Sequence, residues 1–340
     1  MTVRKTSRFF RWEDVQALHA LVSEKWRWQG PCVALHVGDL YWRLRPQPGR
    51  EPRRDIRLWH LGDGGLAGFA WFDHAEGGVA VAYPDAGGSL EMDMLDWFEA
   101  EAARRGCSSF TTGSFVDDER RLATLEQRGY SKAEYGDPHL LASLDDNLSE
   151  PVPPEGYSVG GLAGRHQIER RAAVHRGAWS RPGQPSALTT EVYQRLIELP
   201  GYRQELDLVA TGPDGDFVSC MNAWYDEDLR VGAFEPVGCR PEHRNKGVTR
   251  ALMLEGLRRL RDLGATQAIV CTSTDNPGAQ ALYESCGFSV VGHDWSYTKQ
   301  GRLVVGGGNY RAILDHLGWV SHALPHLPAR RVHNCRGVDH

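Results

Sequence analysis

Long apolar runs are missing from this sequence. None of its 340 residues lies in a stretch approaching the roughly 20 consecutive apolar residues that a membrane-spanning helix needs. The opening segment, residues 1–7, is not followed by the apolar core of a secretory signal. These absences predict a cytoplasmic protein that has no membrane partner.

Runs of basic residues are missing as well. The sequence has 39 Lys and Arg against 44 Asp and Glu, which gives a formal net charge of -5. No stretch carries enough positive charge to follow a phosphate backbone, so a nucleic acid is not an expected partner.

Cysteine and histidine patterns typical of redox and metal sites are also lacking. The seven cysteines are scattered and none forms a C-x-x-C pair, so we expect reduced thiols. His322 and His326 stand four residues apart, but Pro325 interrupts any helix that would put them on one face. No histidine pair combines with a carboxylate at the spacing of a zinc site, and we predict no metal.

What is present indicates a folded protein of two domains. Hydrophobic residues make up 41% of the chain and 11 residues are Trp, which is enough to build a core. Residues 145–156 collect charge, three prolines and a glycine, a composition typical of an exposed connector. We therefore predict one domain over residues 1–148, a second over 151–304 and a tail over 305–340.

Strand and helix patterns alternate in the second domain. The clearest helix begins near residue 248, carries Leu252, Leu257 and Leu260 within one stripe, and is stopped by Gly264. This alternation predicts an α/β fold with a mixed sheet. Strands are expected at 206–211, 217–225, 229–239, 267–272 and from 288 onward, and further helices at 165–179, 188–199 and 277–286.

An internal repeat suggests that the first domain has the same fold. Residues 104–130 align with 262–288 at a constant offset of 158 and without a gap, so that Gly106 falls on Gly264. In this register the Glu-Gln-Arg-Gly-Tyr segment ending at Tyr130 falls on the Glu-Ser-Cys-Gly-Phe segment ending at Phe288. We predict two tandem copies of one fold.

The segment before the clearest helix carries the strongest chemical signal. Residues 240–249 connect a strand to this helix and contain Arg244, Lys246 and Gly247. First-turn N–H groups of a helix have no internal partners and lie at the positive end of its dipole, so they bind anions. Gly247 allows close backbone approach, and a pyrophosphate fits such a row of donors. The alternative interpretation is a solvated basic turn.

Two motifs here resemble those of the GCN5-related N-acetyltransferase (GNAT) family. Residues 244–249, Arg-Asn-Lys-Gly-Val-Thr, resemble its R/Q-x-x-G-x-G/A motif and depart from it at Thr249, where we expect the larger side chain to narrow the anion site. Residues 276–288 keep every named position of its N-x-x-A-x-x-L-Y-x-x-x-G-F segment. The resemblance covers residues 155–300 and implies mixed, mostly antiparallel sheets flanked by helices.

The resemblance also implies roles for individual residues. Asn276 would contact the pantetheine arm of acetyl-CoA. Tyr283 would be the general acid that protonates the departing thiolate, although a structural core tyrosine is the alternative. The pyrophosphate would be bound by the amides of Arg244, Asn245, Lys246, Gly247, Val248 and Thr249, and the pantetheine arm by the strand backbone of Val237, Gly238 and Cys239.

Glu235 is the candidate base that deprotonates the acceptor amine. We expect it to share a strand face with Val231, Ala233 and Val237. Burying a carboxylate on such an apolar face is energetically unfavourable, which indicates a functional role. It could instead be exposed at a bulge, or bind the substrate ammonium as a counter-charge. Pro236 lacks an N–H and predicts a break in the sheet ladder that opens a cleft.

The first copy has lost these features. At the same offset Leu125 replaces the tyrosine and Asp118 replaces the asparagine. The loop positions become Ala86, Gly88, Ser89 and Glu91, so no anion site is left. We expect residues 1–148 to bind no CoA and to pack against the second copy.

The sequence as a whole therefore predicts an acetyl-CoA-dependent N-acetyltransferase. It would transfer an acetyl group to a primary amine of a small molecule or protein by direct attack. The alternatives are an acyltransferase that uses a longer acyl-CoA and a non-catalytic CoA-binding sensor. The tail shows one helical pattern, at 310–317, and neither its role nor the oligomeric state can be read from the residues.

Overall fold

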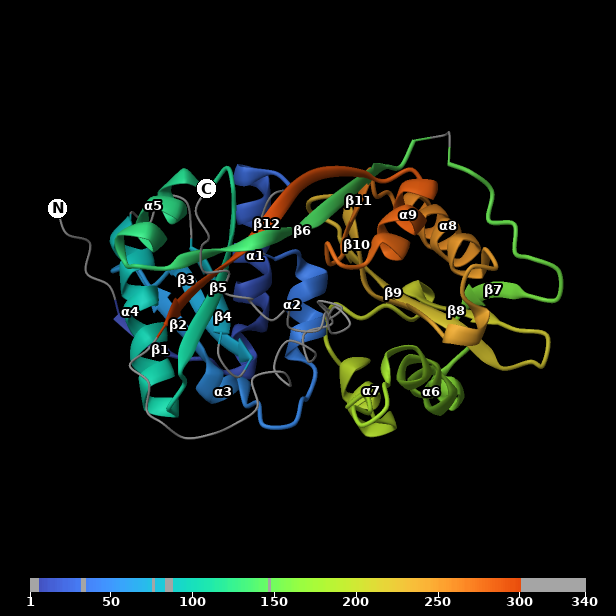
Figure 1. Ribbon diagram of the computed structural model, residues 1–340, viewed down its shortest axis with the longest axis horizontal. Coiled ribbons are helices and arrows are strands. Elements are labelled where there is room, and N and C mark those ends of the chain that lie inside the picture. Colours follow the sequence, from blue (N-terminus) through green and yellow to red (C-terminus); the bar gives the residue numbers. More distant parts are fainter. Residues whose placement is uncertain (1–5, 32–34, 75–76, 83–87, 146–147, 301–340) are drawn as a thin grey trace, which may run out of the picture.

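The computed structural model describes residues 6–31, 35–74, 77–82, 88–145 and 148–300, and the predicted helical pattern at 310–317 lies outside them. Within these ranges a continuous twelve-stranded sheet runs through two lobes (Figure 1). No described helix is long and apolar enough to cross a bilayer.

The first half contributes six strands and five α-helices to the described structure. Its strands are β1 (Thr6–Phe9), β2 (Ile56–His60), β3 (Leu66–His74), β4 (Gly77–Ala82), β5 (Ser109–Phe115) and β6 (Ser131–Ser143), and its helices are α1 (Val15–Gln29), α2 (Val37–Leu44), α3 (Pro52–Asp55), α4 (Gly88–Arg105) and α5 (Glu119–Gln127).

The second half follows a similar order of elements, with two α-helices where the described first half has three between its first two strands. Its strands are β7 (Ser158–Gly161), β8 (Asp207–Thr211), β9 (Phe217–Asp226), β10 (Val231–Cys239), β11 (Gln267–Cys271) and β12 (Ser289–Gln300), and its helices are α6 (Ile168–Trp179), α7 (Thr190–Leu196), α8 (Val248–Asp262) and α9 (Pro277–Ser285). These bounds agree with the predicted elements to within a few residues.

The internal repeat is visible in the elements themselves. Strands β5 and β11 begin at 109 and 267, helices α5 and α9 at 119 and 277, and strands β6 and β12 at 131 and 289, all at the offset found in the sequence. Equivalent side chains also cap equivalent helices. Asp118 accepts the N–H of Arg121 at the start of α5, and Asn276 accepts the N–H of Ala279 at the start of α9.

The two halves exchange their last strands. The sheet order is β1-β2-β3-β4-β5-β12-β6-β11-β10-β9-β8-β7, so β12 of the second half pairs with β5 of the first, and β6 of the first pairs with β11 of the second. Strands β6 and β12 also pair with each other, antiparallel, at the centre of the molecule (Figure 1). The proposed boundary at residues 148–151 therefore divides the chain but not the sheet.

A shared apolar core joins the halves on one face of the sheet. Leu18 of α1 and Leu40 of α2 belong to the same buried cluster as Tyr193 and Trp224 of the second half. The ring of Tyr41 stacks on Trp224 with 5.8 Å between centroids. Burial of such rings is the main source of stability, so each half depends on the other for some of its core.

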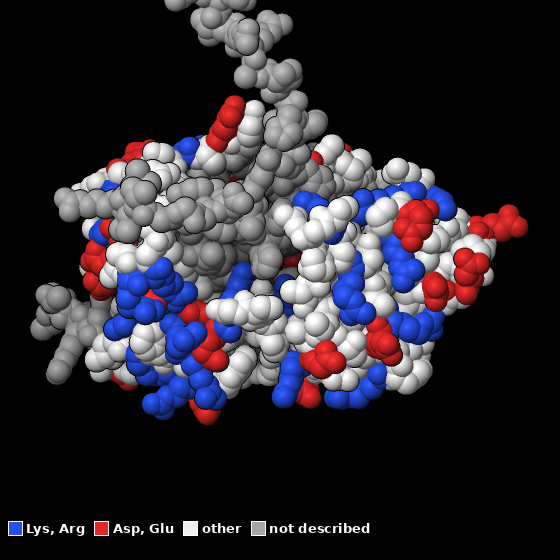
Figure 2. Space-filling view, turned by 60° about the horizontal axis from the view of Figure 1, so that its bottom comes forward, with Lys and Arg blue, Asp and Glu red and all other residues white. Residues whose placement is uncertain are grey.

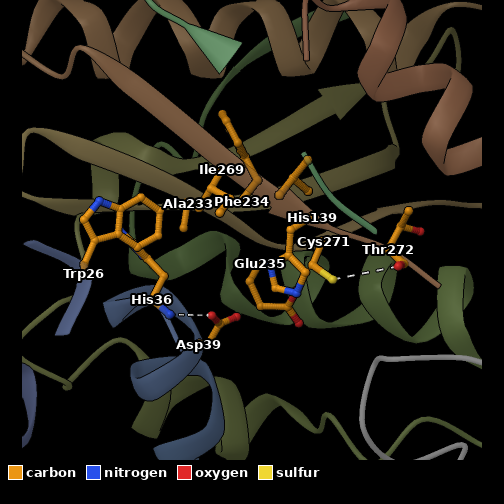
Figure 3. A pocket seen from close by; sticks show the side chains of 11 residues that line it. Trp26, His36, Asp39, His139, Ala233, Phe234, Glu235, Ile269, Cys271 and Thr272 are labelled. Carbon is orange, nitrogen blue, oxygen red and sulfur yellow. Dashed lines mark hydrogen bonds between the residues drawn. The ribbon is translucent and has the colours of Figure 1, made fainter. Parts of the chain in front are cut away.

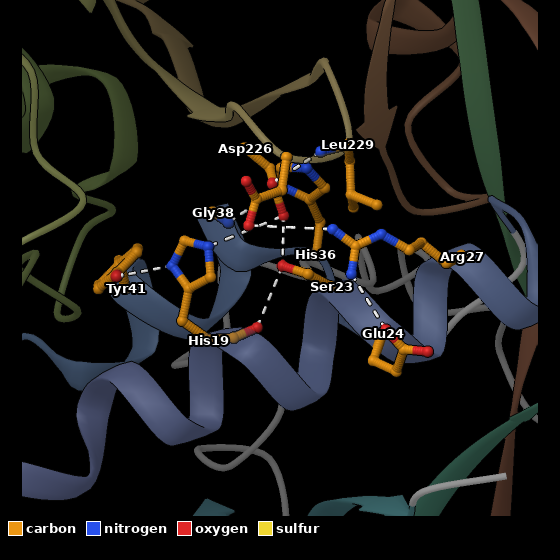
Figure 4. A network of polar contacts seen from close by, with 10 residues as sticks. His19, Ser23, Glu24, Arg27, His36, Gly38, Tyr41, Asp226 and Leu229 are labelled. Atoms are coloured by element: carbon orange, nitrogen blue, oxygen red, sulfur yellow. Dashed lines mark hydrogen bonds and ion pairs between the residues drawn. The ribbon is translucent and has the colours of Figure 1, made fainter.

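A buried polar network holds α1 against the hairpin of β9 and β10 (Figure 4). Asp226, only 1% exposed, accepts the hydroxyl of Ser23 and, at 3.0 Å, the N–H of Leu229. His19 lies 3.8 Å from the same carboxylate through Nε2, and its Nδ1 lies 2.8 Å from the Tyr41 hydroxyl. Because a buried carboxylate needs such partners, this network fixes how the halves are registered.

Candidate active site

Strands β10 and β11 diverge in the middle of the second half. They pair in parallel only from Val231 to Ala233, opposite residues 267–269. The register of β10 against β9 then shifts between Phe234 and Val237, which confirms the predicted break at Pro236. Beyond Ala233 no ladder pairing joins β10 to β11 in the described structure. Side chains occupy some of the freed carbonyls, because that of Glu235 accepts Trp224 Nε1 at 2.6 Å and that of Gly238 accepts the Ser219 hydroxyl.

The loop before α8 leaves the start of that helix open. Gly247 is the N-cap and has φ of +80°, a conformation that side chains other than glycine disfavour. No described side chain caps the helix, and residues 244–247 are exposed. The first-turn N–H groups of α8 therefore have no capping partner in the described structure and lie at the positive end of its dipole, as anion binding requires.

The side chains of this loop have separate tasks. Arg244 donates from Nε to the carbonyl of Cys239 at 3.1 Å and from its second guanidinium nitrogen to the carbonyl of Ala178 at 3.2 Å, so it anchors the loop. Its own N–H donates to the carbonyl of Pro241, which leaves the amides from Asn245 onward for a ligand. Asn245 has φ of 57°, and Lys246 is exposed.

Thr249 does not occupy the anion site as the sequence led us to expect. Its hydroxyl lies 3.2 Å from that of Ser219 on β9, which donates in turn to the carbonyl of Gly238 at 2.8 Å. The side chain is therefore directed toward the sheet, and the expectation that it narrows the pyrophosphate site is wrong. Val248 beside it is buried.

The bulge in β10 changes which way the side chains point in the stretch predicted to bind the pantetheine arm, Val237 to Cys239. Val237 packs with the cluster beneath α8, whereas Val231 and Ala233 pack with Trp26 on the other face. The expectation that Val237 shares a strand face with Val231 and Ala233 is therefore wrong, because the bulge between Phe234 and Val237 changes the alternation of side chains.

Gly238 and Cys239 continue this strand toward the loop. A Cβ built on Gly238 would lie 2.0 Å from the ring of Trp179, so the ring at the end of α6 packs directly on the strand backbone. Cys239 is buried opposite Ser219, and burial raises the pKa of its thiol. A buried thiol with a raised pKa is not a reactive sulfur, so only the backbone of Cys239 is a candidate for ligand binding.

Helix α9 has Asn276 as its N-cap and carries Tyr283, whose phenol is close enough to Glu235 to feel its charge. The Asn276 carbonyl oxygen accepts the N–H of Ala279 at 3.2 Å, and its amide nitrogen makes no hydrogen bond within the described chain. Tyr283 is 5% exposed, packs 6.0 Å from Phe288, and its hydroxyl has no hydrogen-bond partner among the described residues. Burial first, and then the charge of Glu235, raises the pKa of the phenol, so it is protonated at neutral pH.

Glu235 lies at the bulge and lines a cavity (Figure 3). Burial raises its pKa to about 8, the charge of Asp39 adds to that shift, and Arg45 and Arg43 oppose it. A carboxyl group that titrates near neutral pH is suited to proton transfer. The cavity is lined by Ala233 and Phe234 of β10, by Ile269, Val270, Cys271 and Thr272 at the end of β11, and by Trp26, His36, Asp39 and His139 of the first half.

Sequence reasoning did not find the residues that the first half contributes. Trp26, His36, Asp39 and His139 reach the cavity because α1, α2 and β6 pack against the second half, and no motif marks them. Burial lowers the pKa of His36 to about 4 and that of His139 to about 3, so both rings are neutral at pH 7. In the described ranges no three His, Cys, Asp or Glu side chains converge as metal ligands would.

Comparison with known proteins agrees with this geometry. Residues 175–288 match the Acetyltransferase (GNAT) family. The Mycothiol acetyltransferase of Nocardiopsis dassonvillei is 43% identical over 263 residues, which cover 70% of this chain and 79% of that protein.

Two solved structures share the fold. A tandem GNAT protein from the clavulanic acid biosynthesis pathway has a TM-score of 0.62 at 15% identity, covering 90% of this chain and 100% of the other. A GCN5-related N-acetyltransferase from Sphaerobacter thermophilus has a TM-score of 0.59 at 18% identity, covering 87% of this chain and 95% of the other. The resemblance drawn from the two motifs is confirmed, and the chain belongs to the GNAT family of acetyl-CoA-dependent N-acetyltransferases.

Proposed function

We propose that the second half transfers the acetyl group of acetyl-CoA to a primary amine of a small molecule by direct attack. The observation that supports this proposal is the divergence of β10 and β11 beyond Ala233, where Glu235 lines a cavity and the buried phenol of Tyr283 lies close enough for the charge of Glu235 to raise its pKa. The start of α8, where no described side chain caps the helix, follows β10 through the loop at residues 240–247.

The residues along β10 and at the starts of α8 and α9 fit the chemical groups of acetyl-CoA. Free N–H groups from Asn245 to Thr249 would bind the pyrophosphate, and the unpaired edge of β10 from Val237 to Cys239 would bind the amide groups of the pantetheine arm. The free amide nitrogen of Asn276 is available to the same arm. When bound, acetyl-CoA supplies an activated thioester.

The two titratable groups then have complementary roles. Glu235 accepts a proton from the acceptor ammonium, and the freed nitrogen lone pair attacks the thioester carbonyl carbon. As the carbon–sulfur bond breaks, the departing thiolate takes the proton of the Tyr283 hydroxyl. The excess proton on the new amide nitrogen then returns to the Tyr283 phenolate, which leaves a neutral amide, the CoA thiol and one proton on Glu235. The raised pKa of Tyr283 fits a proton donor and not a base. Holding the reactants in this geometry supplies much of the remaining rate enhancement.

A small-molecule acceptor is favoured over a protein amine by the walls of the cavity. Residues from β10 and β11 line it on one side, and residues from α1, α2 and β6 line it on the other. A curated relative also bears the name Mycothiol acetyltransferase. The test is release of CoA thiol from acetyl-CoA in the presence of a panel of primary amines. Binding of CoA without release for any amine would favour the sensor interpretation.

We further infer that the first half binds no CoA. Strands β4 and β5 also pair at only one point, Gly77 with Thr111, but here an ion pair fills the equivalent place. Arg121 of α5 contacts the carboxylate of Glu91 near the start of α4 and donates to the Thr112 hydroxyl at 2.8 Å. In the second half these two positions are Ala279 and Thr249, which leave room for a ligand. Ala86 lies outside the described residues.

Replacing Tyr283 by phenylalanine should lower kcat by about a hundredfold, because only the transferable proton is removed. Affinity for CoA, measured by calorimetry, should stay close to that of the wild type. Tyr225→Phe is a suitable control, because that hydroxyl lies near Gly264, in another region of the sheet. An unchanged kcat in Tyr283→Phe would restrict this residue to a packing role.

Activity should rise with pH and level off above about 8, the pKa to which burial raises Glu235. Activity increases with pH, and does not decrease, because only the ionised carboxylate of Glu235 can accept the ammonium proton. The measurement is kcat/KM for the amine between pH 6 and 10. Glu235→Gln should abolish this inflection and leave only that of the amine itself. An identical profile in both proteins would assign the base elsewhere.

A further inference from the structure

Asp39 of the first half lines the same cavity as Glu235 (Figure 3). It is the third residue of α2, and its Oδ2 accepts the N–H of His36 at 2.8 Å in a capping box. Its other oxygen makes no hydrogen bond to any described residue. One carboxylate oxygen therefore completes the helix cap, and the second is available to a molecule in the cavity.

The cavity is suited to a cationic group. In the described structure its lining contains two carboxyl groups, those of Asp39 and Glu235, and no Lys or Arg. The two histidines that line it are neutral at pH 7, and the indole of Trp26 offers an aromatic surface that also attracts cations. Burial raises the pKa of both carboxyl groups, and Arg43 opposes that rise at Asp39 and at Glu235, as Arg45 does at Glu235, but neither arginine lines the cavity.

We propose that Asp39 binds the ammonium group of the acceptor and places its nitrogen for deprotonation by Glu235. This inference rests on the proposed function of the second half and adds that the active site is built from both halves. The sequence left two alternative roles for Glu235, the base or the counter-charge; in this proposal Glu235 is the base and Asp39 is the counter-charge. Acceptors are then amines that enter as ammonium ions.

The inference can be tested without knowing the natural acceptor. Two thioethers of CoA serve as probes, S-(2-aminoethyl)-CoA, which ends in an ammonium group, and S-propyl-CoA, its uncharged isostere. Both would be held by the proposed cofactor site and would place their ends in the cavity. At pH 7 the full-length wild type should bind the ammonium probe roughly tenfold more tightly, as one charge-assisted contact predicts.

Asp39→Asn should remove this preference and leave the affinity for S-propyl-CoA unchanged. The asparagine oxygen can still accept the N–H of His36, so the cap of α2 is kept. Asp228→Asn is the matched control, because it removes one carboxylate whose side chain is 79% exposed, and it should keep the wild-type preference.

Three results would overturn the inference, and they differ from one another. Equal affinity of the wild type for the two probes would show that the cavity has no counter-charge. A preference that survives in Asp39→Asn would assign the counter-charge to another residue. If neither probe binds the wild type at millimolar concentration, the proposed cofactor site itself fails. Calorimetry on the wild type alone decides the first and third, so the test does not depend on the variant folding.

Discussion

Neither residues 1–148 nor residues 151–340 should fold when expressed alone. The second fragment lacks β6, so β11 and β12 both lose a neighbouring strand, and the first fragment lacks β12, which pairs with both β5 and β6. Each fragment would also expose its side of the core that contains Leu40 and Trp224. Circular dichroism and thermal unfolding should show no cooperative transition for either fragment.

Co-expression is the matching control for that result. The same two fragments together should assemble into a complex that unfolds cooperatively, because only the exposed connector near residues 149–150 is cut. A fragment of residues 151–340 that unfolds cooperatively by itself and binds CoA would contradict this interdependence. In that case the exchanged strand and the shared core would contribute much less to stability than their burial indicates.

Gly247→Glu should weaken acetyl-CoA binding by at least about a hundredfold, roughly 3 kcal/mol. The substitution places a carboxylate at the N-cap of α8, beside the amides proposed for the pyrophosphate, where it can accept those N–H groups itself. It also repels the ligand anion. The measurement is calorimetric titration with acetyl-CoA in low salt.

Gly247→Ala separates charge from backbone strain. Both substitutions force a side chain into φ of +80°, which costs roughly 1 kcal/mol, and the nearest atom to a new Cβ is 3.8 Å away. The alanine variant should therefore lose stability but retain most of its affinity. Equal losses of affinity in the two variants would show that the loop conformation, and not the open anion site, controls binding.

The features of the site that were predictable from sequence follow local rules. A glycine at the N-cap of α8 and an asparagine cap on α9 act within a few residues of chain, so motif and structure agree there. Pro236 likewise predicts the break in β10, because a residue without a backbone N–H cannot continue the hydrogen bonding between strands.

The features that were not predictable depend on tertiary packing. The alternation of side chains along β12 is the same whether the strand pairs within its own half or with β5 of the other half. Strand exchange could therefore not be predicted from the sequence. Asp39 carries the ordinary pattern of a helix cap, and only the packing of α2 against the second half brings it to the cavity. The error about Val237 arose because a bulge is not visible in residue alternation.

The exchanged strands also bear on how a duplicated gene diverges. Normally one of two copies can be deleted once the other performs the task. Here β6 stands between β12 and β11, so deleting the first copy would remove a central strand from the sheet that supports the second. The first half therefore cannot be lost without removing support from the second, so the exchanged strands bind the two halves into a unit that is kept or lost as a whole.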